Sequence, residues 1–388
     1  MEQDYYLAID AFRLVSQPQT SGAFIVSELV REISKIPRIK KIILLLPENP
    51  GDDFLFSDLL ENQKTVFLFP EKPFFPHKYF HSTVMWIQFT IPKLLQKVEI
   101  THFIAPYHQA PIFLKHRIKV VTIIHDICGI LQSAGSSYLK KSPYRHWINF
   151  LTALIRSNAF VYVSEHTKKS FERLLPYAKH RPSSVIYPKP TITHPSNRLE
   201  IESLITQWGL SYKGYFFAFG VKGLRKGTDI TLAAYSKYLD LGGKKKLVLL
   251  INNSSIEYFN ELVEDFPYEV ILISNLSIFE RDAIYAGAIA LIFPSRCEGF
   301  GYPILEAMCQ GCPPIALENS PAKEIIGDCV HSLDKLHCEE IASCMQEYEN
   351  NTKHSRQELE NRLILQANEF IEQNNMAQKY FNLIQSIN

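Results

Sequence analysis

Residues 293–311 read FPSRCEGFGYPILEAMCQG, and this stretch is the most informative for the fold. An apolar strand ends near Pro294, and a glycine-rich loop, Glu298–Tyr302, follows it. Pro303 then suits the first position of a helix, where its missing N–H costs nothing. Glycines let the backbone approach a ligand closely, and a helix N-terminus offers unpaired N–H groups with partial positive charge. The stretch therefore predicts a strand–loop–helix unit with a binding site at the loop.

Two carboxylates accompany this loop. Glu298 lies in the loop and Glu306 in the expected first helical turn, and helical side chains lean toward the N-terminus, so both can face one cavity. Each carboxylate accepts hydrogen bonds from neighbouring hydroxyl groups. Taken singly, Glu306 is typical of an acid that compensates the helix dipole, and Glu298 of a solvated loop residue. Together they favour a ligand rich in hydroxyl groups.

The same alternation of apolar runs and amphipathic stretches continues on both sides. The runs lack period-two polarity, which is typical of strands buried on both faces of a parallel sheet. Expected strands are Tyr6–Asp10, Ile42–Leu45, Thr65–Leu68, Ile100–Ile104, Val120–Ile124, Phe160–Val163, Tyr215–Phe219, Leu247–Ile251, Val270–Ile273, Ile289–Phe293 and Pro314–Leu317. Expected helices include Ala23–Ile33, Phe80–Gln96, Asp229–Leu239, Phe279–Ala286, Ile304–Gln310 and Cys338–Glu349. The pattern predicts an α/β protein with doubly wound, Rossmann-like sheets.

A proline-rich segment, YPKPTITHPSNR at Tyr187–Arg198, interrupts the pattern near the middle of the chain. It suits neither a helix nor an inner strand. We expect an N-terminal domain at 1–190 and a C-terminal domain at 191–370. The last helix, about 370–388, either packs on the second domain or returns to the first. Because ligands bind outside the carboxyl ends of such strands, a cleft between the two domains is the expected site.

The segment EGFGYPILEA resembles the EX7E signature of the retaining glycosyltransferases of family 4, which have the GT-B fold. The similarity extends over Ser277–Gly327, with YAGAIALIFPS before the loop and SPAKEIIGD after it. The resemblance implies that 1–190 is the acceptor domain and 191–370 the nucleotide-sugar donor domain, and that Glu306 holds the nucleotide ribose of the donor. It also implies that Glu298 and the backbone of Gly299, Phe300, Gly301 and Tyr302 hold the transferred sugar.

A second match is FAFGVKGLRKGT at Phe217–Thr228, where a strand ends and a helix capped by Thr228 is expected. An Arg-Lys pair is usually a solvated surface feature. At this position in the family, however, Arg225 and Lys226 resemble the basic residues that bind the departing diphosphate. The diphosphate needs positive charge nearby as its bond to the sugar breaks. The chain departs from relatives that have a basic residue directly after the strand glycine, because Val221 stands there and Lys222 follows.

The first domain matches the family at three strand ends. TIIHDI at Thr122–Ile127 resembles the family's HD element, which implies that His125 lies beside the donor sugar. VSEHTK at Val163–Lys168 resembles a strand-end serine before a helix. QTSGAFIVSEL at Gln19–Leu29 stands where relatives have a glycine loop, so the resemblance implies contact of Gly22 with donor phosphate or acceptor.

We find no DxD motif, so we expect neither a metal nor a cofactor, and the Arg-Lys pair takes the metal's place. The resemblance implies retention at the anomeric carbon by front-face attack, with the leaving phosphate taking the acceptor's proton. No carboxylate is assigned as a nucleophile. The seven cysteines do not resemble a disulfide framework, and the CxxC of Cys309 and Cys312 is typical of two small apolar residues rather than of a metal or redox site.

Two segments of the first domain are basic, aromatic and free of acids: Lys72–Val98 and Cys128–Ser164. Such segments occur where a helix lies on an anionic membrane, but they equally suit a core face with a solvated lysine face. The net charge of +1 gives no indication of nucleic acid binding. We expect a cytoplasmic protein, with the inner membrane face as an alternative location, and the oligomeric state stays open.

The combined interpretation is a retaining hexosyltransferase. It would move a sugar from a nucleotide diphosphate donor, GDP-mannose or a UDP-sugar, to a glycan or lipid-linked glycan in surface polysaccharide synthesis. Two alternatives remain: a sugar-nucleotide epimerase of the same fold, and a non-catalytic binding protein.

Overall fold

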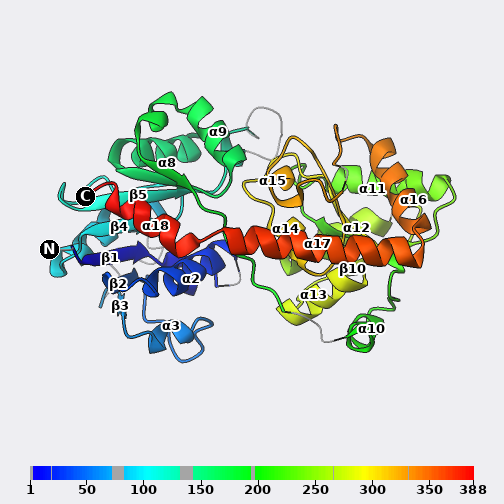
Figure 1. Cartoon of the computed structure of the whole chain (residues 1–388), viewed down its shortest axis with the longest axis horizontal. Coiled ribbons are helices and arrows are strands. Elements are labelled where there is room, and N and C mark those ends of the chain that lie inside the picture. Colours follow the sequence, from blue (N-terminus) through cyan, green and yellow to red (C-terminus); the bar gives the residue numbers. More distant parts are fainter. Residues whose placement is uncertain are drawn as a thin grey trace. The chain divides into compact units, whose positions relative to one another are not determined.

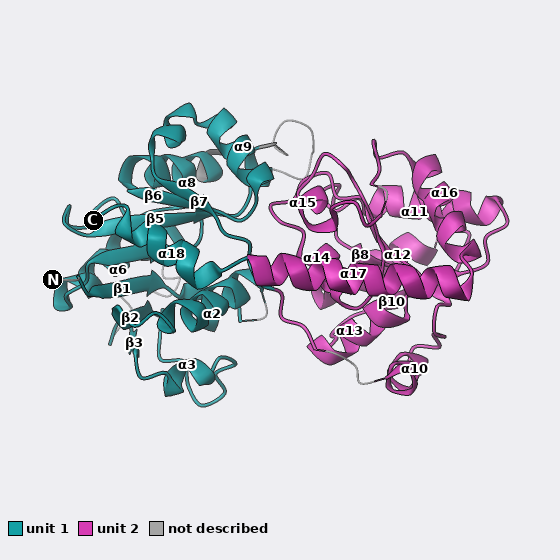
Figure 2. Ribbon diagram, in the orientation of Figure 1, with its two compact units in different colours: residues 1–134, 139–189, 374–388 teal, residues 135–138, 190–373 magenta. Residues whose placement is uncertain are grey.

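The computed structural model describes residues 3–18, 20–71, 83–131, 143–193, 197–264, 266–330 and 332–388. These residues divide into two compact units (Figure 2). Unit 1 comprises 3–131, 143–189 and 374–388, and unit 2 comprises 190–373, apart from the gaps just given. Each unit is described by itself below.

Unit 1 contains, in its described part, a seven-stranded parallel sheet in the order β3-β2-β1-β4-β5-β6-β7. The strands are β1 Tyr5–Asp10, β2 Ile39–Leu45, β3 Thr65–Leu68, β4 His102–Ala105, β5 Lys119–Ile124, β6 Ala159–Tyr162 and β7 Ser183–Val185. Strand order reverses between β1 and β4, so the carboxyl ends of these two neighbours form the switch point of the sheet.

Helices cover both faces of this sheet (Figure 1). They are α1 Phe12–Ser16, α2 Ser21–Ser34, α3 Asp58–Glu61, α5 Thr83–Met85, α6 Ile91–Leu94, α7 Cys128–Leu131, α8 Pro143–Arg156, α9 Glu165–Leu174 and α18 Met376–Gln385, with a π-helix η1 Trp86–Thr90 and 3-10 turns η2 Leu95–Lys97 and η4 Pro176–His180. Apolar side chains of η1 and α6 pack on β1, β2 and β4, and those of α8 and α9 pack on β5 and β6.

Unit 2 contains, within its described residues, a five-stranded parallel sheet in the order β10-β9-β8-β11-β12. Its strands are β8 Tyr215–Gly220, β9 Lys246–Ile251, β10 Val270–Ile273, β11 Leu291–Phe293 and β12 Pro314–Ala316. Its helices are α10 Arg198–Thr206, α11 Thr228–Asp240, α12 Ile256–Glu264, α13 Ile278–Gly287, α14 Tyr302–Cys309, α15 Ala322–Ile326, α16 Cys338–Asn350 and α17 Lys353–Gln373, with a 3-10 turn η5 Asn253–Ser255.

The predicted α/β architecture with parallel, doubly wound sheets is confirmed. One expected helix is wrong in detail. From Thr83 onward the segment expected at Phe80–Gln96 consists of α5, η1, α6 and η2 rather than one α-helix, and residues 80–82 lie outside the described residues. Pro92 lacks a backbone N–H and so cannot continue a regular hydrogen-bond ladder, which favours such a local change of helix type.

The C-terminal stretch forms two helices rather than one. Helix α17 ends at Gln373, and α18 begins at Met376 after Asn375, whose side chain accepts a hydrogen bond from the backbone N–H of Gln378 at 3.1 Å. Helix α17 packs on α14 and α15 in unit 2, whereas α18 packs on α2 and β7 in unit 1. The side chain of Asn374 also donates to the Tyr187 carbonyl within unit 1.

No helix in the described part of the chain has both the length and the apolar character that a membrane span requires.

Candidate active site

The sugar-site loop of unit 2 follows β11 and leads into α14. Gly301 is the N-cap of α14 and has a φ of 100°, a left-handed conformation that favours glycine. Tyr302 and Pro303 are therefore the first and second helical residues, so Pro303 lies one position later than expected. The ring of Phe300 packs edge-on against Tyr302 at 5.3 Å and stacks on Phe370 of α17 at 6.2 Å. The loop is thus braced from inside the unit.

Glu298 lies at the centre of a small polar network. Its Oε1 accepts a hydrogen bond from Ser295 Oγ at 2.6 Å and forms an ion pair with Lys226. Arg225 Nη1 lies 3.8 Å from the same oxygen. In the described residues no hydrogen bond engages Oε2, and Glu298 lines a hollow together with Ser295, Phe300 and Gly301. Glu298 therefore has one oxygen held by the protein and one available to a ligand.

The network forms because β8 and β11 are neighbours in the sheet. The loop after β8 carries Arg225 and Lys226, and the loop after β11 carries Glu298, so their carboxyl ends meet at one edge. Arg296 ties the two loops together, because its N–H donates to the Arg225 carbonyl at 2.8 Å and its guanidinium pairs with Asp229 at 2.6 Å. The structure thus brings Arg225, Lys226 and Glu298 together.

A glycine makes the approach of these loops possible. Gly227 has a φ of 73°, and a Cβ atom there would lie 2.2 Å from the Pro294 carbonyl oxygen. Gly227, not Thr228 as expected, is the N-cap of α11. Thr228 is buried instead, and its hydroxyl accepts from the Val221 N–H at 3.1 Å, which closes the loop from 221 to 228. Lys222 places its ammonium over the Tyr258 ring, 4.7 Å from the centroid.

Glu306 belongs to a second polar network, separate from that of Glu298. It is the fifth residue of α14 and so lies beyond the first helical turn where it was expected. Its Oε1 accepts from Arg281 Nη1 at 2.9 Å and its Oε2 from Tyr285 at 3.2 Å. Burial raises the pKa of Glu306, although the nearby Arg281 guanidinium opposes this shift. Glu298 and Glu306 share no described hydrogen-bond partner.

Arg281 also anchors the segment that begins unit 2. Its Nη2 donates to the Thr191 carbonyl at 2.8 Å and pairs with Asp282, whose other oxygen accepts from the Thr193 N–H at 2.6 Å. Sequence reasoning missed Arg281, Tyr285, Ser295 and Arg296. A partly buried charged or hydroxyl side chain on a helix or loop carries no local pattern that distinguishes it from a solvated one.

In unit 1, His125 directly follows β5. Its Nε2 lies 2.6 Å from the Pro106 carbonyl oxygen, and its backbone N–H donates to His108 Nδ1 at 3.3 Å. Burial lowers the pKa of His125, so the ring is neutral at pH 7 and Nε2 must carry the proton that meets the carbonyl. Nδ1 is then an acceptor. His125 can accept a hydrogen bond from a hydroxyl group, but its Nε2 is not free to act as a base.

The other expected elements of unit 1 are found at strand ends. Ser164 is the N-cap of α9, and its Oγ accepts from the Thr167 N–H at 2.9 Å. Gly22 is the second residue of α2, and a Cβ atom there would lie 2.5 Å from Arg13 Nη1. Gly22 therefore makes room for an arginine side chain that sequence reasoning did not single out.

The CxxC residues behave as buried apolar groups. Cys309 and Cys312 are free thiols, and burial raises the pKa of each to about 12, which leaves no thiolate at pH 7. Among the described residues, no group of three or more His, Cys, Asp or Glu side chains is placed to hold a metal ion.

Comparison with known proteins assigns the class of this fold and site. Residues 214–367 match the family model of the glycosyl transferases group 1. This range contains the strand ends that carry Arg225, Lys226, Glu298 and Glu306. The match lies within unit 2 and covers less than half of the chain, so this part of the chain is similar to the glycosyl transferases group 1.

Individual relatives support this assignment. The chain is 25% identical to the O-antigen chain mannosyltransferase B of Escherichia coli over 229 residues, which span 57% of this chain and 59% of that protein. The match therefore covers less than two thirds of that relative's length.

Solved structures share the fold over nearly the whole chain. A sucrose-phosphate synthase from Thermosynechococcus elongatus has a TM-score of 0.72 at 14% identity, covering 100% of this chain and 99% of that one. Anabaena HepE, crystallised with UDP and glucose, has a TM-score of 0.68 at 15% identity, covering 98% and 100%. WaaG, a glycosyltransferase involved in lipopolysaccharide biosynthesis, has a TM-score of 0.66 at 14% identity, covering 98% and 99%. The fold is therefore GT-B.

Proposed function

We propose that the chain is a retaining glycosyltransferase that transfers a hexose from a nucleotide diphosphate donor to a glycan or a lipid-linked glycan during surface polysaccharide synthesis. The observation that carries the proposal is the convergence of Arg225, Lys226 and Glu298 at the carboxyl ends of β8 and β11. This is where a doubly wound sheet binds its ligand, and these are charges that a nucleotide-sugar needs.

The chemistry follows from these charges. As the bond between the anomeric carbon and the phosphate oxygen breaks, negative charge grows on the diphosphate, and Arg225 and Lys226 stabilise it. The acceptor oxygen bonds to the anomeric carbon on the same face, and its proton moves to the leaving phosphate oxygen. Glu298 uses its available Oε2 to accept hydrogen bonds from the sugar, while its bond from Ser295 and its pair with Lys226 fix its position.

Further residues position the donor in this proposal. Glu306 accepts hydrogen bonds from the ribose, and the N–H groups of residues 299–302 hold the sugar and phosphate at the start of α14. His125 contributes the Nδ1 acceptor of a neutral imidazole to a sugar hydroxyl. Gly22 contributes its backbone N–H at the start of α2.

We favour mannose as the transferred sugar, with GDP as its carrier. The support is the similarity to a relative named as a mannosyltransferase. A UDP-sugar is the alternative, because HepE, a structural neighbour, was crystallised with UDP-glucose.

The test compares nucleotides directly. The purified protein is heated with UDP, GDP, ADP or CMP, with and without magnesium, and is then incubated with GDP-mannose or UDP-glucose to measure slow donor hydrolysis. We expect GDP to stabilise the protein without magnesium and GDP-mannose to be hydrolysed. Stabilisation by UDP alone would reassign the donor. No stabilisation and no hydrolysis with any nucleotide would contradict the proposed activity.

The acceptor proposal draws support from an exposed apolar face of unit 1, formed by Phe89, Ile112, Phe113, Ile148, Leu151 and Ile155. Phe113 and Ile155 are each 65% exposed. Hydrogen bonds join the three segments that carry the face, because Gln88 bonds to the Ala110 carbonyl and to the Ile112 N–H, and Thr152 accepts from the Ala110 N–H.

Charge near this face favours an anionic membrane as its partner. The described stretches 83–98, 109–119 and 143–158 contain no acid, and Lys93, Lys115 and Arg117 are exposed beside the apolar residues. An exposed apolar patch with basic neighbours is typical of a peripheral membrane contact. On this basis we propose that the enzyme reaches a lipid-linked acceptor at a membrane surface. Of the two basic segments predicted from sequence, residues 72–82 and 132–142 lie outside the described residues.

Vesicle flotation tests this contact. The triple variant Ile148→Ser, Leu151→Ser, Ile155→Ser should lose binding to vesicles that contain anionic lipid. The double variant Leu199→Ser, Leu365→Ser removes exposed leucines from unit 2 and should float like the unmodified protein. Equal flotation of all three proteins, or no flotation of the unmodified protein, would contradict the membrane contact.

A further inference from the structure

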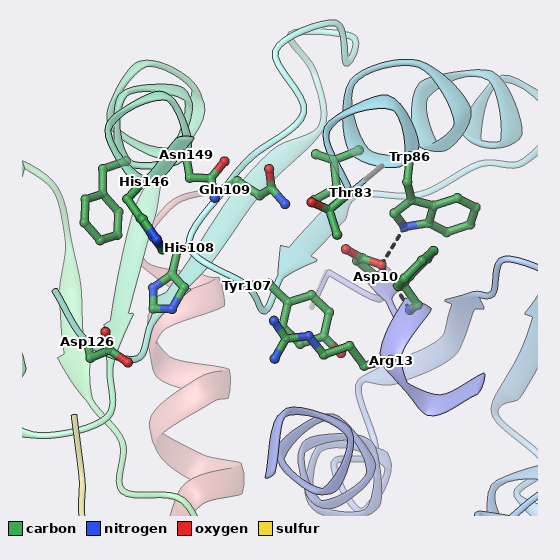
Figure 3. A pocket seen from close by; sticks show the side chains of 13 residues that line it. Asp10, Arg13, Thr83, Trp86, Tyr107, His108, Gln109, Asp126, His146 and Asn149 are labelled. Carbon is green, nitrogen blue, oxygen red and sulfur yellow. Dashed lines mark hydrogen bonds between the residues drawn. The ribbon is translucent and has the colours of Figure 1, made fainter. Parts of the chain in front are cut away.

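Unit 1 contains a cavity of about 230 Å³ at the switch point of its sheet (Figure 3). Its walls come from the segments that follow β1, β4 and β5, together with η1 and α8. The carboxyl ends of β1 and β4, where the strand order reverses, are where a doubly wound sheet binds ligands. None of the residues in the donor network of unit 2 lines this cavity.

Asp10 and Arg13 form one wall. Asp10 is buried at the end of β1, and its Oδ1 accepts hydrogen bonds from Trp86 Nε1 at 2.8 Å and from the Phe12 N–H at 3.1 Å. In the described residues neither an ion pair nor a hydrogen bond engages Oδ2. The Arg13 guanidinium lies over the Tyr107 ring, 4.4 Å from its centroid, and no described ion pair or hydrogen bond involves it (Figure 3). Both groups can therefore bond to a ligand.

The opposite wall is polar as well. Gln109, His146 and Asn149 line it, and no described residue forms a hydrogen bond with their side chains. Gln109 is only 5% exposed, and a buried amide without a partner costs free energy unless a ligand or water meets it. Asp126 adds a carboxylate next to His125, the residue that we assign to the donor sugar.

Two glycines make room for the polar side chains of this cavity. A Cβ atom at Gly22 would lie 2.5 Å from Arg13 Nη1, and one at Gly129 would lie 2.4 Å from the His146 ring. In addition, His108 has a φ of 62°, an uncommon conformation for a residue other than glycine. Backbone strain of this kind costs free energy and persists where the surroundings require it, often at functional sites. These features indicate that the cavity is a specific binding site and not a packing defect.

The chemistry of the walls identifies the class of ligand. Trp86, Phe12 and Tyr107 offer apolar ring surfaces, and the amides, carboxylates and guanidinium offer directed hydrogen bonds, which together suit a sugar ring with its apolar faces and its rim of hydroxyls. Pockets for drug-sized ligands run to roughly 300–1,000 Å³, so this smaller one fits a single ring. Two carboxylates and one guanidinium line the cavity, so these groups together carry a net negative charge, which disfavours an anionic ligand.

We propose that this cavity binds one uncharged hexose residue, the terminal residue of the acceptor glycan, with Arg13 and Asn149 holding its hydroxyls. This inference rests on the proposed transferase function and adds the chemical class of the acceptor's reacting end. It predicts that the enzyme extends a glycan that ends in a neutral sugar, not in a uronic acid or a sugar phosphate.

Ligand-detected NMR on the full-length protein tests the inference, with methyl α-mannopyranoside, methyl α-glucopyranoside and methyl β-galactopyranoside as neutral probes and methyl β-glucuronide as the charged one. We expect saturation transfer to at least one neutral probe and none to the glucuronide. Arg13→Gln and, independently, Asn149→Leu should weaken this binding at least tenfold, whereas Lys237→Ala on the exposed face of α11 in unit 2 should not change it.

Separate readouts distinguish the two proposals. Donor hydrolysis and stabilisation by nucleotide report on unit 2 and should persist in Arg13→Gln. The inference is overturned if no neutral probe binds, if the glucuronide binds as well as the neutral probes, or if both unit 1 variants bind like the unmodified protein. Intact sugar binding without any nucleotide response would instead overturn the transferase proposal.

Discussion

The strand-end sites of the two units differ in how their charges are satisfied. In unit 2, Lys226 and Arg225 lie against Glu298, and Arg281 pairs with Glu306, so each of these charges has an opposite charge beside it. In unit 1, Arg13 has no ion pair in the described residues, and Asp10 is bonded only to neutral donors. We call the site of Arg225, Lys226, Glu298 and Glu306 the paired site and the cavity of unit 1 the open site. Ion pairs fix the positions of the cations that would bind a diphosphate, whereas polar groups without partners suit a neutral ligand with hydroxyl groups.

The largest expected effect comes from breaking the paired site. Lys226→Ala should lower kcat by about 10²–10³-fold, because it removes a preorganised cation from the leaving diphosphate. Donor affinity should change much less, since this charge matters most as the bond breaks. The measurement is the steady-state rate of transfer or of donor hydrolysis. Lys237→Ala, on the exposed face of α11, is the matched control, and a Lys226→Ala enzyme as fast as this control would contradict the assignment of Lys226 to the diphosphate.

The buried carboxyl group of the open site should make the stability of the protein depend on pH. Burial raises the pKa of Asp10 to about 6, against the lowering effect of its hydrogen bond from Trp86. A carboxyl whose pKa is raised by folding binds its proton more tightly in the folded state, so the contribution of Asp10 to stability is greatest below about pH 4 and is lost as pH rises to about 6. Asp10→Asn keeps the Oδ1 acceptor but removes the charge.

The difference in unfolding free energy between Asp10→Asn and the unmodified protein should therefore shift in favour of the variant across this range. The shift should reach up to about 3 kcal/mol and stay level above pH 7. Urea unfolding at a series of pH values, followed by the fluorescence of Trp86 and the other tryptophans, measures it. A difference that does not vary with pH would mean that Asp10 is not a buried, proton-binding carboxyl.

Alanine variants of two glycines distinguish the effect of a steric contact from the effect of backbone strain at the paired site. Gly227 and Gly223 both have positive φ, but only at Gly227 would a Cβ atom meet another group, the Pro294 carbonyl oxygen at 2.2 Å. Both alanine variants should be strained. Gly227→Ala should be less stable than Gly223→Ala by about 1–3 kcal/mol, the usual effect of overpacking. Thermal unfolding of the two variants side by side makes the comparison, and equal melting temperatures would show that the loops can separate at little cost.

The sequence predicted the paired site better than the open one, for a physical reason. Glycines, an Arg-Lys pair and two glutamates sit within short loops after strands, so neighbours in sequence are also neighbours in space. The partners Arg281 and Tyr285 reach Glu306 from another helix, and no local pattern indicates that contact. The cap at Gly227 in place of Thr228 likewise depends on the fit against β11, which is a tertiary effect.

Two lining residues of the open site lie in segments noted from the sequence: Asp10 ends an expected strand, and Asp126 belongs to the segment TIIHDI. The other lining residues come from segments that are distant along the chain and meet only once β4 and β5 take their places beside β1. The strands themselves were predictable, because burial on both faces leaves continuous apolar runs. The choice of helix type after residue 83 and the break between α17 and α18 were not, since both depend on single residues, Pro92 and Asn375.

The smallest expected effect sharpens the role of Glu306. If this carboxylate accepts a hydrogen bond from the ribose, Glu306→Gln should weaken GDP binding by about tenfold, the equivalent of about 1.4 kcal/mol. The variant also perturbs the pair with Arg281, so affinity for GDP alone does not isolate the ribose contact. Calorimetry with GDP, 2′-deoxy-GDP and 3′-deoxy-GDP gives a double-mutant cycle for each ribose hydroxyl. The unmodified protein should bind at least one deoxy nucleotide more weakly than GDP. Glu306→Gln should bind that nucleotide and GDP with equal affinity. A variant that still discriminates as strongly would place the ribose elsewhere and leave Glu306 as a structural partner of Arg281, in keeping with the paired character of its site.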